Sequence, residues 1–341
     1  MFNTVKPLET PREIKHLTPV PASIAELKSR RDAEIAAVLK GEDRRMLMII
    51  GPCSADNPKA VVEYIGRLGK LQIEVRDKVI IIPRIYTGKP RTKGEGYKGI
   101  FHQPDPAKAP DLAAGILLTR KMNLDAIEAS GLTCADEMLY PDNYAYMDDL
   151  LSYVTIGARS SENQQHRLVG SGVTTALGVK NPMHGSMQVL INSIYSTQIP
   201  NEFQYNSEQV RTSGNPLSHA VLRGFVDDNG LNNPNYHYED VVKFSAMYEK
   251  AGLANPSIVI DTNHSNSNKD PLQQLRIVHE VMTNRAYSGD FGRYIKGFMV
   301  ESYLEDGRQE VSGHVYGKSI TDACIGWEKT ARLLYEVAEK V

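Results

Sequence analysis

The stretch MLMIIGPC at residues 46–53 is a run of apolar residues that ends in Gly51, Pro52 and Cys53. A continuous apolar run, as opposed to an alternating one, is typical of a parallel strand that is buried on both faces. The Cys53 thiol follows the run directly. The segment therefore predicts a buried parallel strand with a reactive side chain at its carboxyl end.

Further short runs of apolar and β-branched residues follow along the chain, and helical patterns separate most of them. The runs are VIIIPRIY (79–86), CADEML (134–139), YVTIGAR (153–159), TTALGVK (174–180), HAVLRG (219–224), SIVIDTNH (257–264) and GFMVES (297–302). Eight strands that alternate with helices favour a (β/α)8 TIM barrel. An open doubly wound sheet is the alternative that the same pattern allows.

The helical patterns define the rest of the organisation. They cover residues 57–70, 111–130, 142–152, 161–171, 185–197, 239–252, 271–284 and 319–338. Asp111 is a good N-cap for the second of these helices, and Gly131 is a suitable residue to end it. Residues 46–341 are expected to form the barrel, with an extra hairpin within 206–214 between the fifth and sixth strands. Residues 1–45 are expected to be an N-terminal extension, with a helix at 23–40 that covers the barrel bottom or forms a subunit contact.

Composition excludes several classes of protein. The chain has 341 residues, 41% hydrophobic and 23% charged, with a formal net charge of −2, which is ordinary for a globular protein. Because there is no basic excess, we expect no nucleic-acid partner. Three cysteines without a C-x-x-C pair, no signal-like N-terminus and no long apolar stretch predict a cytoplasmic protein without a membrane partner.

The expected strand ends carry two chemically distinct sets of side chains. Chemistry in (β/α)8 barrels lies at the carboxyl ends of the strands. The first set combines a thiol, an imidazole and carboxylates, which suit a divalent transition metal. Its members are Cys53, His264, Glu301 and Asp322. A buried structural role is the usual one for a lone cysteine or histidine, but barrel closure would bring strands one, seven and eight together.

The second set consists of cations. Its members are Arg84, Arg159, Lys180 and Arg223, with Glu137 close enough in the pattern to pair with one of them. Four unpaired cations in one barrel mouth would repel one another, and a polyanionic ligand would offset this repulsion. The loop TGKPRTKGEGYKG at 87–99 adds further basic residues and is either a second phosphate contact or a solvated loop. His166 is interpreted as an ordinary helix residue.

Motifs at these positions resemble the class I 3-deoxy-7-phosphoheptulonate (DAHP) synthases, the family with phenylalanine-, tyrosine- and tryptophan-regulated members. The resemblance covers essentially the whole chain. The motifs are GPCS (51–54), KPRT (89–92), GYKG (96–99), IGARSSENQQHR (156–167), VKN (179–181), LRG (222–224), DTNHSN (261–266), MVES (299–302) and YGKSITDACIGWE (316–328). Each short motif is weak alone, whereas their order at successive strand ends is highly specific.

The resemblance implies an activity and a set of residue roles. It implies a metal-dependent transferase that condenses phosphoenolpyruvate with erythrose 4-phosphate, the first step of the shikimate pathway. Cys53, His264, Glu301 and Asp322 match the family's metal ligands, for manganese, iron, cobalt or zinc. Phosphoenolpyruvate would bind Arg84, Glu137, Arg159, Lys180 and Arg223, and erythrose 4-phosphate would bind Lys89, Pro90, Arg91 and Thr92. Lys89 is also the candidate proton donor or water-orienting group, so that Lys89, Cys53 and His264 form the candidate catalytic set.

The resemblance leaves regulation and assembly open. The chain departs from the family pattern at ADNP (55–58), at NPMHG (181–185) and in the short excursion at 203–214, a region that helps to form the family's inhibitor pocket. An aromatic amino-acid inhibitor and a homodimer or homotetramer are expected partners. The alternatives are a related enzyme that condenses phosphoenolpyruvate with another sugar, a non-catalytic phospholigand sensor, and a Schiff-base aldolase that uses Lys180.

Overall fold

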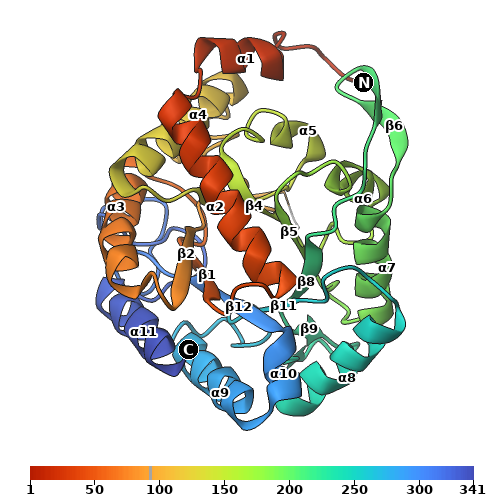
Figure 1. The fold of residues 1–341 in the computed structure, drawn as a ribbon. Helices are drawn as coiled ribbons and strands as arrows, with labels where there is room; N and C mark the ends of the chain where they lie inside the picture. Colours follow the sequence, from red (N-terminus) through yellow and green to blue (C-terminus); the bar gives the residue numbers. More distant parts are fainter. Residues whose placement is uncertain (92–93) are drawn as a thin grey trace.

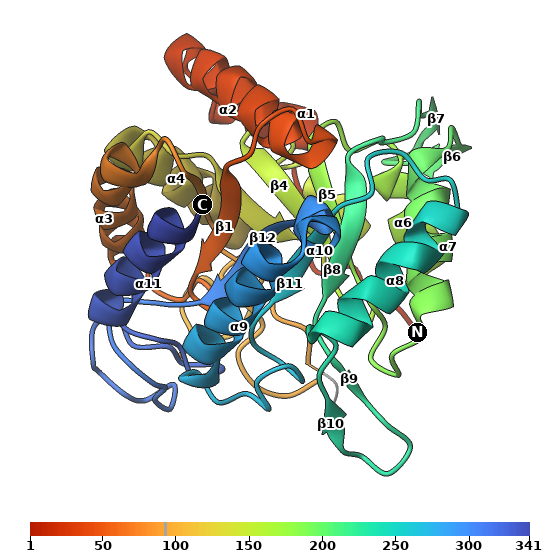
Figure 2. The same ribbon diagram turned by 60° about the horizontal axis from the view of Figure 1, so that its bottom comes forward.

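The computed structural model describes residues 1–91 and 94–341, and its centre is one parallel sheet of eight strands (Figures 1 and 2). The sheet order is β2-β1-β12-β11-β8-β5-β4-β3. The strands are β1 (Met46–Gly51), β2 (Val79–Pro83), β3 (Cys134–Glu137), β4 (Leu151–Ile156), β5 (Ala176–Lys180), β8 (Ser218–Leu222), β11 (Ile258–Asp261) and β12 (Ile295–Glu301).

The two ends of this order meet, which distinguishes a barrel from an open sheet. Arg84 and Ala135 form a parallel bridge next to β2 and β3, and the Ile85 amide donates to the Ala135 carbonyl at 2.9 Å. The first strand in turn pairs with the last, with Leu47 opposite Gly297. The predicted (β/α)8 barrel is therefore confirmed, and the open doubly wound sheet is excluded.

Helices surround the barrel and shield its strands from water. The outer helices are α3 (Pro58–Val75), α4 (Leu112–Ser130), α6 (Gln164–Gly170), α7 (Met187–Gln198), α8 (Tyr238–Lys250), α9 (Gln273–Tyr287), α10 (Gly289–Tyr294) and α11 (Trp327–Lys340). The predicted caps of α4 are confirmed, because Asp111 accepts from the Ala114 amide and Gly131 is left-handed. Among the described residues, none of the helices is both long and apolar enough to cross a membrane.

Two predicted helices are wrong in extent. The pattern at 142–152 gives only the short α5 (Pro141–Tyr144), because tight turns follow it and the chain already enters β4 at Leu151. The pattern at 319–338 becomes helical only from Trp327, after a bent segment that holds Asp322. Helix α1 (Pro11–Leu17) was not predicted, although Thr10 and Glu13 form a capping box at its start.

Helix α2 (Ala22–Lys40) lies across the end of the barrel at which the strands begin (Figure 2). Its residues Ile35, Val38 and Leu39 are buried in one cluster with strand residues such as Leu47 and Ile80. Polar contacts fix the helix as well, since Arg31 donates to the Ile81 carbonyl at 2.6 Å and Ser257 donates to the Leu39 carbonyl at 2.8 Å. This end of the barrel is thus closed, and the carboxyl ends of the strands remain open.

Two hairpins interrupt the regular alternation. Strands β6 (Glu202–Tyr205) and β7 (Glu208–Arg211) form the hairpin predicted between the fifth and sixth barrel strands, with Asn206 and Ser207 at positive φ in its turn. A second hairpin, of β9 (Phe225–Val226) and β10 (Asn232–Asn233), was not predicted. Figure 2 shows it projecting at the end of the molecule opposite α2.

Candidate active site

A cavity of about 310 Å³ lies at the carboxyl ends of the barrel strands. Side chains from seven strand ends and from the adjoining loops line it. Of the predicted residues, the lining includes Arg84, Lys89, Pro90, Arg91, Glu137, Arg159, Lys180, Arg223, His264, Glu301 and Asp322. The barrel therefore brings residues from distant parts of the sequence into one cavity.

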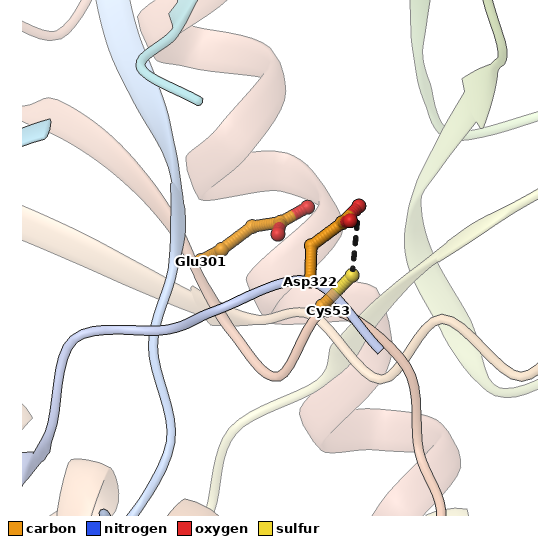
Figure 3. Close-up of side chains that lie close together, drawn as sticks. All are labelled: Cys53, Glu301 and Asp322. Carbon is orange, nitrogen blue, oxygen red and sulfur yellow. Dashed lines mark hydrogen bonds between the residues drawn. The ribbon is translucent and has the colours of Figure 1, made fainter. Parts of the chain in front are cut away.

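Cys53, Glu301 and Asp322 lie close together (Figure 3), and Glu301 and Asp322 line this cavity. One potential ligand atom from each lies within 4.8 Å of the others, and Cys53 Sγ is 3.6 Å from Asp322 Oδ2. Cys53 follows β1, Glu301 ends β12, and Asp322 comes from the bent segment before α11. Burial, reinforced by the Glu301 carboxylate, raises the pKa of the Cys53 thiol to about 11. A bound cation would favour the thiolate.

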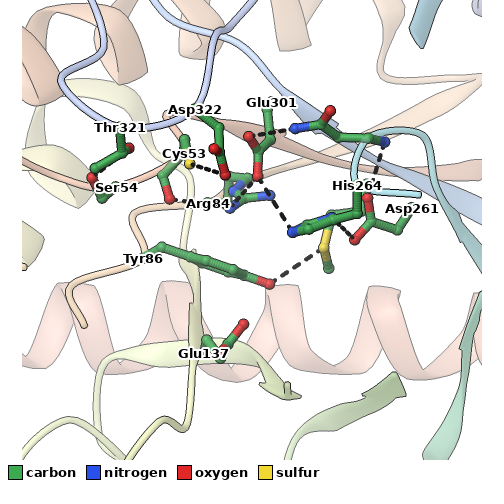
Figure 4. Close-up of polar contacts among 12 residues, drawn as sticks. Cys53, Ser54, Arg84, Tyr86, Glu137, Asp261, His264, Glu301, Thr321 and Asp322 are labelled. Atoms are coloured by element: carbon green, nitrogen blue, oxygen red, sulfur yellow. Dashed lines mark hydrogen bonds and ion pairs between the residues drawn. The ribbon is translucent and has the colours of Figure 1, made fainter. Parts of the chain in front are cut away.

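His264 lies beside this group but is not one of its three members (Figure 4). Its Nε2 is 4.0 Å from Glu301 Oε1, and its Nδ1 is 2.9 Å from Asp261 Oδ2. Burial lowers the pKa of His264 despite the Asp261 carboxylate, so the imidazole is neutral at pH 7. A carboxylate on the second ring nitrogen is the usual way of orienting a histidine that ligates a metal. The backbone of His264 has a φ of 53°, which is uncommon for a residue other than glycine.

Arg84 links the two predicted sets of residues. It is 1% exposed, its guanidinium carbon lies 3.7 Å from the centre of the Tyr86 ring, and its Nη2 lies 3.3 Å from Glu301 Oε1. Burial raises the pKa of Glu301, but Arg84 and His264 more than offset this and the pKa is lowered. Glu301 is therefore ionised, as a metal ligand has to be.

The four predicted cations differ in whether a carboxylate pairs with them. Lys180 lies 3.0 Å from Asp261 and 4.0 Å from Glu137, the carboxylate expected to pair with one of the cations, and Arg84 pairs with Glu301. Within the described part of the chain, Arg159 and Arg223 form no ion pair. Arg223 is buried and donates to Ser265 Oγ at 3.3 Å. The cavity thus retains positive charge for an anion.

The loop after β2 lies over the same cavity. The Lys89 ammonium contacts Cys53 Sγ at 2.6 Å and Asp322 Oδ2 at 3.5 Å, and Arg91 Nε donates to the Tyr97 carbonyl at 2.8 Å. Gly99 has a φ of 91°, and a Cβ there would lie 2.2 Å from the Thr87 carbonyl oxygen, so only glycine closes the loop. Thr92 lies outside the described residues.

The structure adds functional candidates that the sequence analysis did not single out. Asp261 is fully buried and lies between Lys180 and His264, and Asn263 Nδ2 donates to Glu301 Oε2 at 2.6 Å. Lys269 contacts Asp322 at 3.2 Å, and Tyr86 lies under Arg84. Asp261 and Asn263 lie in the DTNHSN motif, which was the available signal for them.

His166 lies in α6, where its ring nitrogens contact Asn163 and the Leu139 carbonyl at 2.9 and 3.0 Å.

Comparison with known proteins gives these features a context. The model of the DAHP synthetase I family matches residues 20–335. The chain belongs to this family. It is 37% identical over 331 residues to the phospho-2-dehydro-3-deoxyheptonate aldolase of Haemophilus influenzae, with 95% of this chain and 88% of the relative covered. It is 38% identical to the Phe-sensitive enzyme of Escherichia coli, with 97% and 96% covered.

The Tyr-sensitive phospho-2-dehydro-3-deoxyheptonate aldolase of Escherichia coli is 36% identical, with 97% of this chain and 92% of the relative covered. The solved structure of the Francisella tularensis aldolase superposes with a TM-score of 0.93 at 31% identity, covering 100% of this chain and 98% of that one. Members of the DAHP synthetase I family are transferases that use phosphoenolpyruvate and are generally metal-dependent. The group of Cys53, Glu301 and Asp322 fits such a metal.

Proposed function

We propose that this chain is a 3-deoxy-7-phosphoheptulonate synthase, which condenses phosphoenolpyruvate with erythrose 4-phosphate and releases inorganic phosphate. The observation that carries the proposal is the composition of one cavity. Glu301 and Asp322 of the group suited to a metal line it, and so do Arg159 and Arg223, which form no ion pair within the described residues. A phospholigand sensor would need the cations but not the metal ligands.

We propose Cys53, His264, Glu301 and Asp322 as the ligands of the divalent metal. The buried Glu301 Oε1 has no hydrogen-bond partner among the described residues, although Arg84 and His264 lie near it, so it has capacity for a further cation. Thiolate, imidazole and carboxylate together suit manganese, iron, cobalt or zinc. When bound, such a metal supplies Lewis-acid polarisation of the aldehyde oxygen.

Phosphoenolpyruvate is the proposed ligand of Arg84, Arg159, Lys180 and Arg223. Arginine forks match the geometry of carboxylate and phosphate groups, and Lys180 adds a point charge. Glu137, 4.0 Å from Lys180, orients that ammonium. Burial lowers the pKa of Lys180, but Tyr86 and Asp261 more than offset this, so the pKa is raised and the amine stays protonated. A Schiff base needs a neutral amine, and this argues against the aldolase alternative.

Erythrose 4-phosphate is the proposed ligand of the loop that contains Lys89, Pro90, Arg91 and Thr92. Because Arg91 uses its Nε for the Tyr97 carbonyl, its terminal nitrogens are oriented and available for a phosphate. A phosphate held there places the aldehyde toward the metal ligands. This loop favours a phosphorylated four-carbon aldehyde over the sugars of related condensing enzymes.

Lys89 is the proposed proton donor or water-orienting group. Burial lowers its pKa, but Cys53, Glu301 and Asp322 more than offset this and the pKa is raised, so a proton is held at Nζ. The same ammonium contacts Cys53 and Asp322 and so lies beside the proposed metal ligands. From this position the ammonium can donate a hydrogen bond or a proton to the aldehyde oxygen as that oxygen gains negative charge.

We further propose that an aromatic amino acid inhibits the chain at a cleft beside the β6–β7 hairpin. The relatives include Phe-, Tyr- and Trp-sensitive enzymes, which supports aromatic regulation. The cleft is lined by the apolar and aromatic residues Tyr144, Val169, Phe203, Tyr205 and Val210 and by the charged residues Asp148 and Arg211. These residue types suit the aromatic ring, the ammonium group and the carboxylate group of an aromatic amino acid.

We expect a homodimer or homotetramer, which light scattering would detect.

A spectrophotometric assay tests the proposed function. Phosphoenolpyruvate, erythrose 4-phosphate and manganese are mixed with the chain, and the loss of enol absorbance is followed. We expect turnover that stops after exhaustive chelation and returns with added metal. Full activity without metal would refute the metal site, and absence of turnover with every one of the four metals would refute the enzyme. Adding phenylalanine, tyrosine or tryptophan to the same assay identifies the inhibitor.

A further inference from the structure

A second cavity, of about 740 Å³, lies at the opposite end of the barrel from the candidate active site. The end of α2, the residues that lead into β1, and the α9–α10 segment before β12 surround it. Figures 1 and 2 both show the end of α2 near α10. Lys296 Nζ lies 3.6 Å from the position of a Cβ on Gly41, so these segments touch.

This floor cavity has a strongly positive lining. Six basic side chains line it, Lys40, Arg44, Arg45, Arg285, Arg293 and Lys296, whereas Asp43 is the one acidic side chain among the described lining residues. The floor of a barrel that works at its other end has no catalytic need for such a concentration of charge. The excess of basic side chains in this cavity therefore indicates a role other than catalysis.

Pairing within the chain neutralises only part of this charge. Arg45 lies 2.7 Å from Asp43 and 3.7 Å from Glu34, and the exposed Arg293 lies 3.5 Å from Glu249. Across residues 1–91 and 94–341, Lys40, Arg44, Arg285 and Lys296 have no ion pair. The Nε of Arg285 is buried and lacks a hydrogen-bond partner among those same residues. Four positive charges thus face the cavity without a counter-charge.

The cations also destabilise one another. Burial lowers the pKa of Lys296, and Arg285 and Arg293 lower it further. Burial likewise lowers the pKa of Arg285. Cations held together in a partly desolvated site have an energetic cost, and an anion between them offsets that cost.

We propose that the floor cavity binds a small molecule with two or more phosphate groups. Guanidinium forks match phosphate oxygens, and lysines add charge without strict geometry. The volume is within the range of small-molecule sites and exceeds what one phosphate fills. Inorganic polyphosphates and nucleoside polyphosphates share this chemistry. The site does not rest on the proposed reaction, because no residue of the candidate active site lines it.

Binding here is expected to stabilise the fold and not to alter the chemistry. Met46 and Ile295, which begin the neighbouring strands β1 and β12, line the floor cavity. A ligand that bridges α2, α9 and the start of β12 binds only the folded chain, and so it raises the free energy of unfolding. The N-terminal end of a (β/α)8 barrel is the end associated with stability.

Calorimetric titration with inorganic pyrophosphate tests the proposal. The metal-loaded chain is held with saturating phosphoenolpyruvate, so that pyrophosphate does not bind at the proposed phosphoenolpyruvate site. The test variant is R285M/K296M, and the matched control is K243M/K250M, which removes two exposed lysines of α8 and therefore the same charge. Each charge-assisted contact to a phosphate corresponds to roughly tenfold in affinity.

We expect one pyrophosphate per chain, a loss of at least about tenfold in affinity in R285M/K296M, and little change in the control. A melting curve and an unchanged KM for phosphoenolpyruvate show that R285M/K296M is folded. R44A, which removes one lining cation, provides a second variant with a smaller expected loss of affinity. Equal losses in test and control, or no saturable binding to the parent chain, would overturn the proposal. Tripolyphosphate and ATP then identify the source: equal affinities support a site for phosphate alone, and tighter ATP supports a nucleotide site.

Discussion

The guanidinium of Arg84 lies 3.3 Å from the carboxylate of Glu301, and both side chains are 1% exposed. The pair joins the residues proposed for phosphoenolpyruvate to those proposed for the metal. Arg84 follows β2 and Glu301 ends β12, and the single strand β1 separates them in the barrel. Removing one of the two charges is expected to destabilise the fold, because an unpaired buried ion has a far higher free-energy cost than a buried pair.

Glu301→Gln is expected to lower metal affinity and stability together. The amide is a weaker ligand than a carboxylate, and it leaves the buried Arg84 charge without its partner. We expect a loss of about 3 kcal/mol in the free energy of unfolding, measured by urea denaturation. Metal content after dialysis should fall as well. The double variant R84M/E301M should recover most of the stability without recovering the metal, and failure of that recovery would contradict the role of the pair.

Cys53→Ser is expected to lower metal affinity with little effect on the fold. Serine is nearly isosteric with cysteine, but its hydroxyl is a much weaker metal ligand than a thiolate. Competition with a chelator of known affinity measures the loss, which should exceed about tenfold. Cys134→Ser is the matched control, since Cys134 is equally buried but lies in β3 outside the metal group. Equal metal retention in the two variants would argue against Cys53 as a ligand.

Arg223→Ala should impair the use of phosphoenolpyruvate and leave stability nearly intact. Arg223 is buried with Ser265 and the Gly224 carbonyl as its contacts, so its removal breaks no described ion pair and relieves repulsion in the cavity. We expect a higher KM for phosphoenolpyruvate or a lower kcat, with a melting temperature that falls little or rises. A large loss of stability with unchanged kinetics would instead assign Arg223 a structural role.

Arg91→Ala should impair the use of erythrose 4-phosphate specifically. Charge-assisted contacts to a phosphate contribute about 1.5–3 kcal/mol each, which corresponds to a loss of roughly ten- to a hundredfold in kcat/KM for the aldehyde. Discrimination against unphosphorylated erythrose should shrink in the same variant. Steady-state kinetics with each substrate varied in turn give the answer. Weaker phosphoenolpyruvate binding with normal use of the aldehyde would contradict the assignment of the loop.

His219 is expected to make the barrel sensitive to acid. Its Nε2 lies 2.6 Å from the Tyr153 hydroxyl and its Nδ1 lies 2.8 Å from the Leu217 carbonyl. Burial lowers its pKa from 6.5 to about 4, so the folded chain holds a neutral imidazole. Below pH 6.5 the unfolded chain takes up a proton that the folded chain excludes, and stability falls as the pH decreases toward 4.

The His219 contribution is about 3 kcal/mol across that pH window. Urea denaturation of the parent chain and of His219→Gln at pH 7 and pH 4.5 measures it. The variant should lose less stability on acidification than the parent chain does. Parallel losses in the two proteins would show that His219 titrates normally.

The sequence by itself determined the succession of eight buried strands along the chain and much of the cavity lining. Runs such as 46–50 and 79–83 are apolar throughout because parallel strands are covered on both faces, so a continuous apolar run identifies them without tertiary information. Because strand ends face one side of a barrel, Cys53, Arg84, Lys180 and Glu301 could be placed at a common site. Asp111 and Gly131 defined the two ends of α4, because helix caps depend only on residues close by in the sequence.

Only the tertiary structure decided which charges pair and which face a cavity. Asp261 ends β11 and neutralises Lys180 at the end of β5, across the intervening strand β8, and no local pattern reports such a contact. The segment around Asp322 is bent despite its helical pattern, because the backbone of Cys324 and Ile325 pairs with residues that follow β12. The basic floor cavity likewise joins residues from both ends of the chain. Burial and through-space charge depend on distances that barrel closure sets, and this is why the sequence could not supply them.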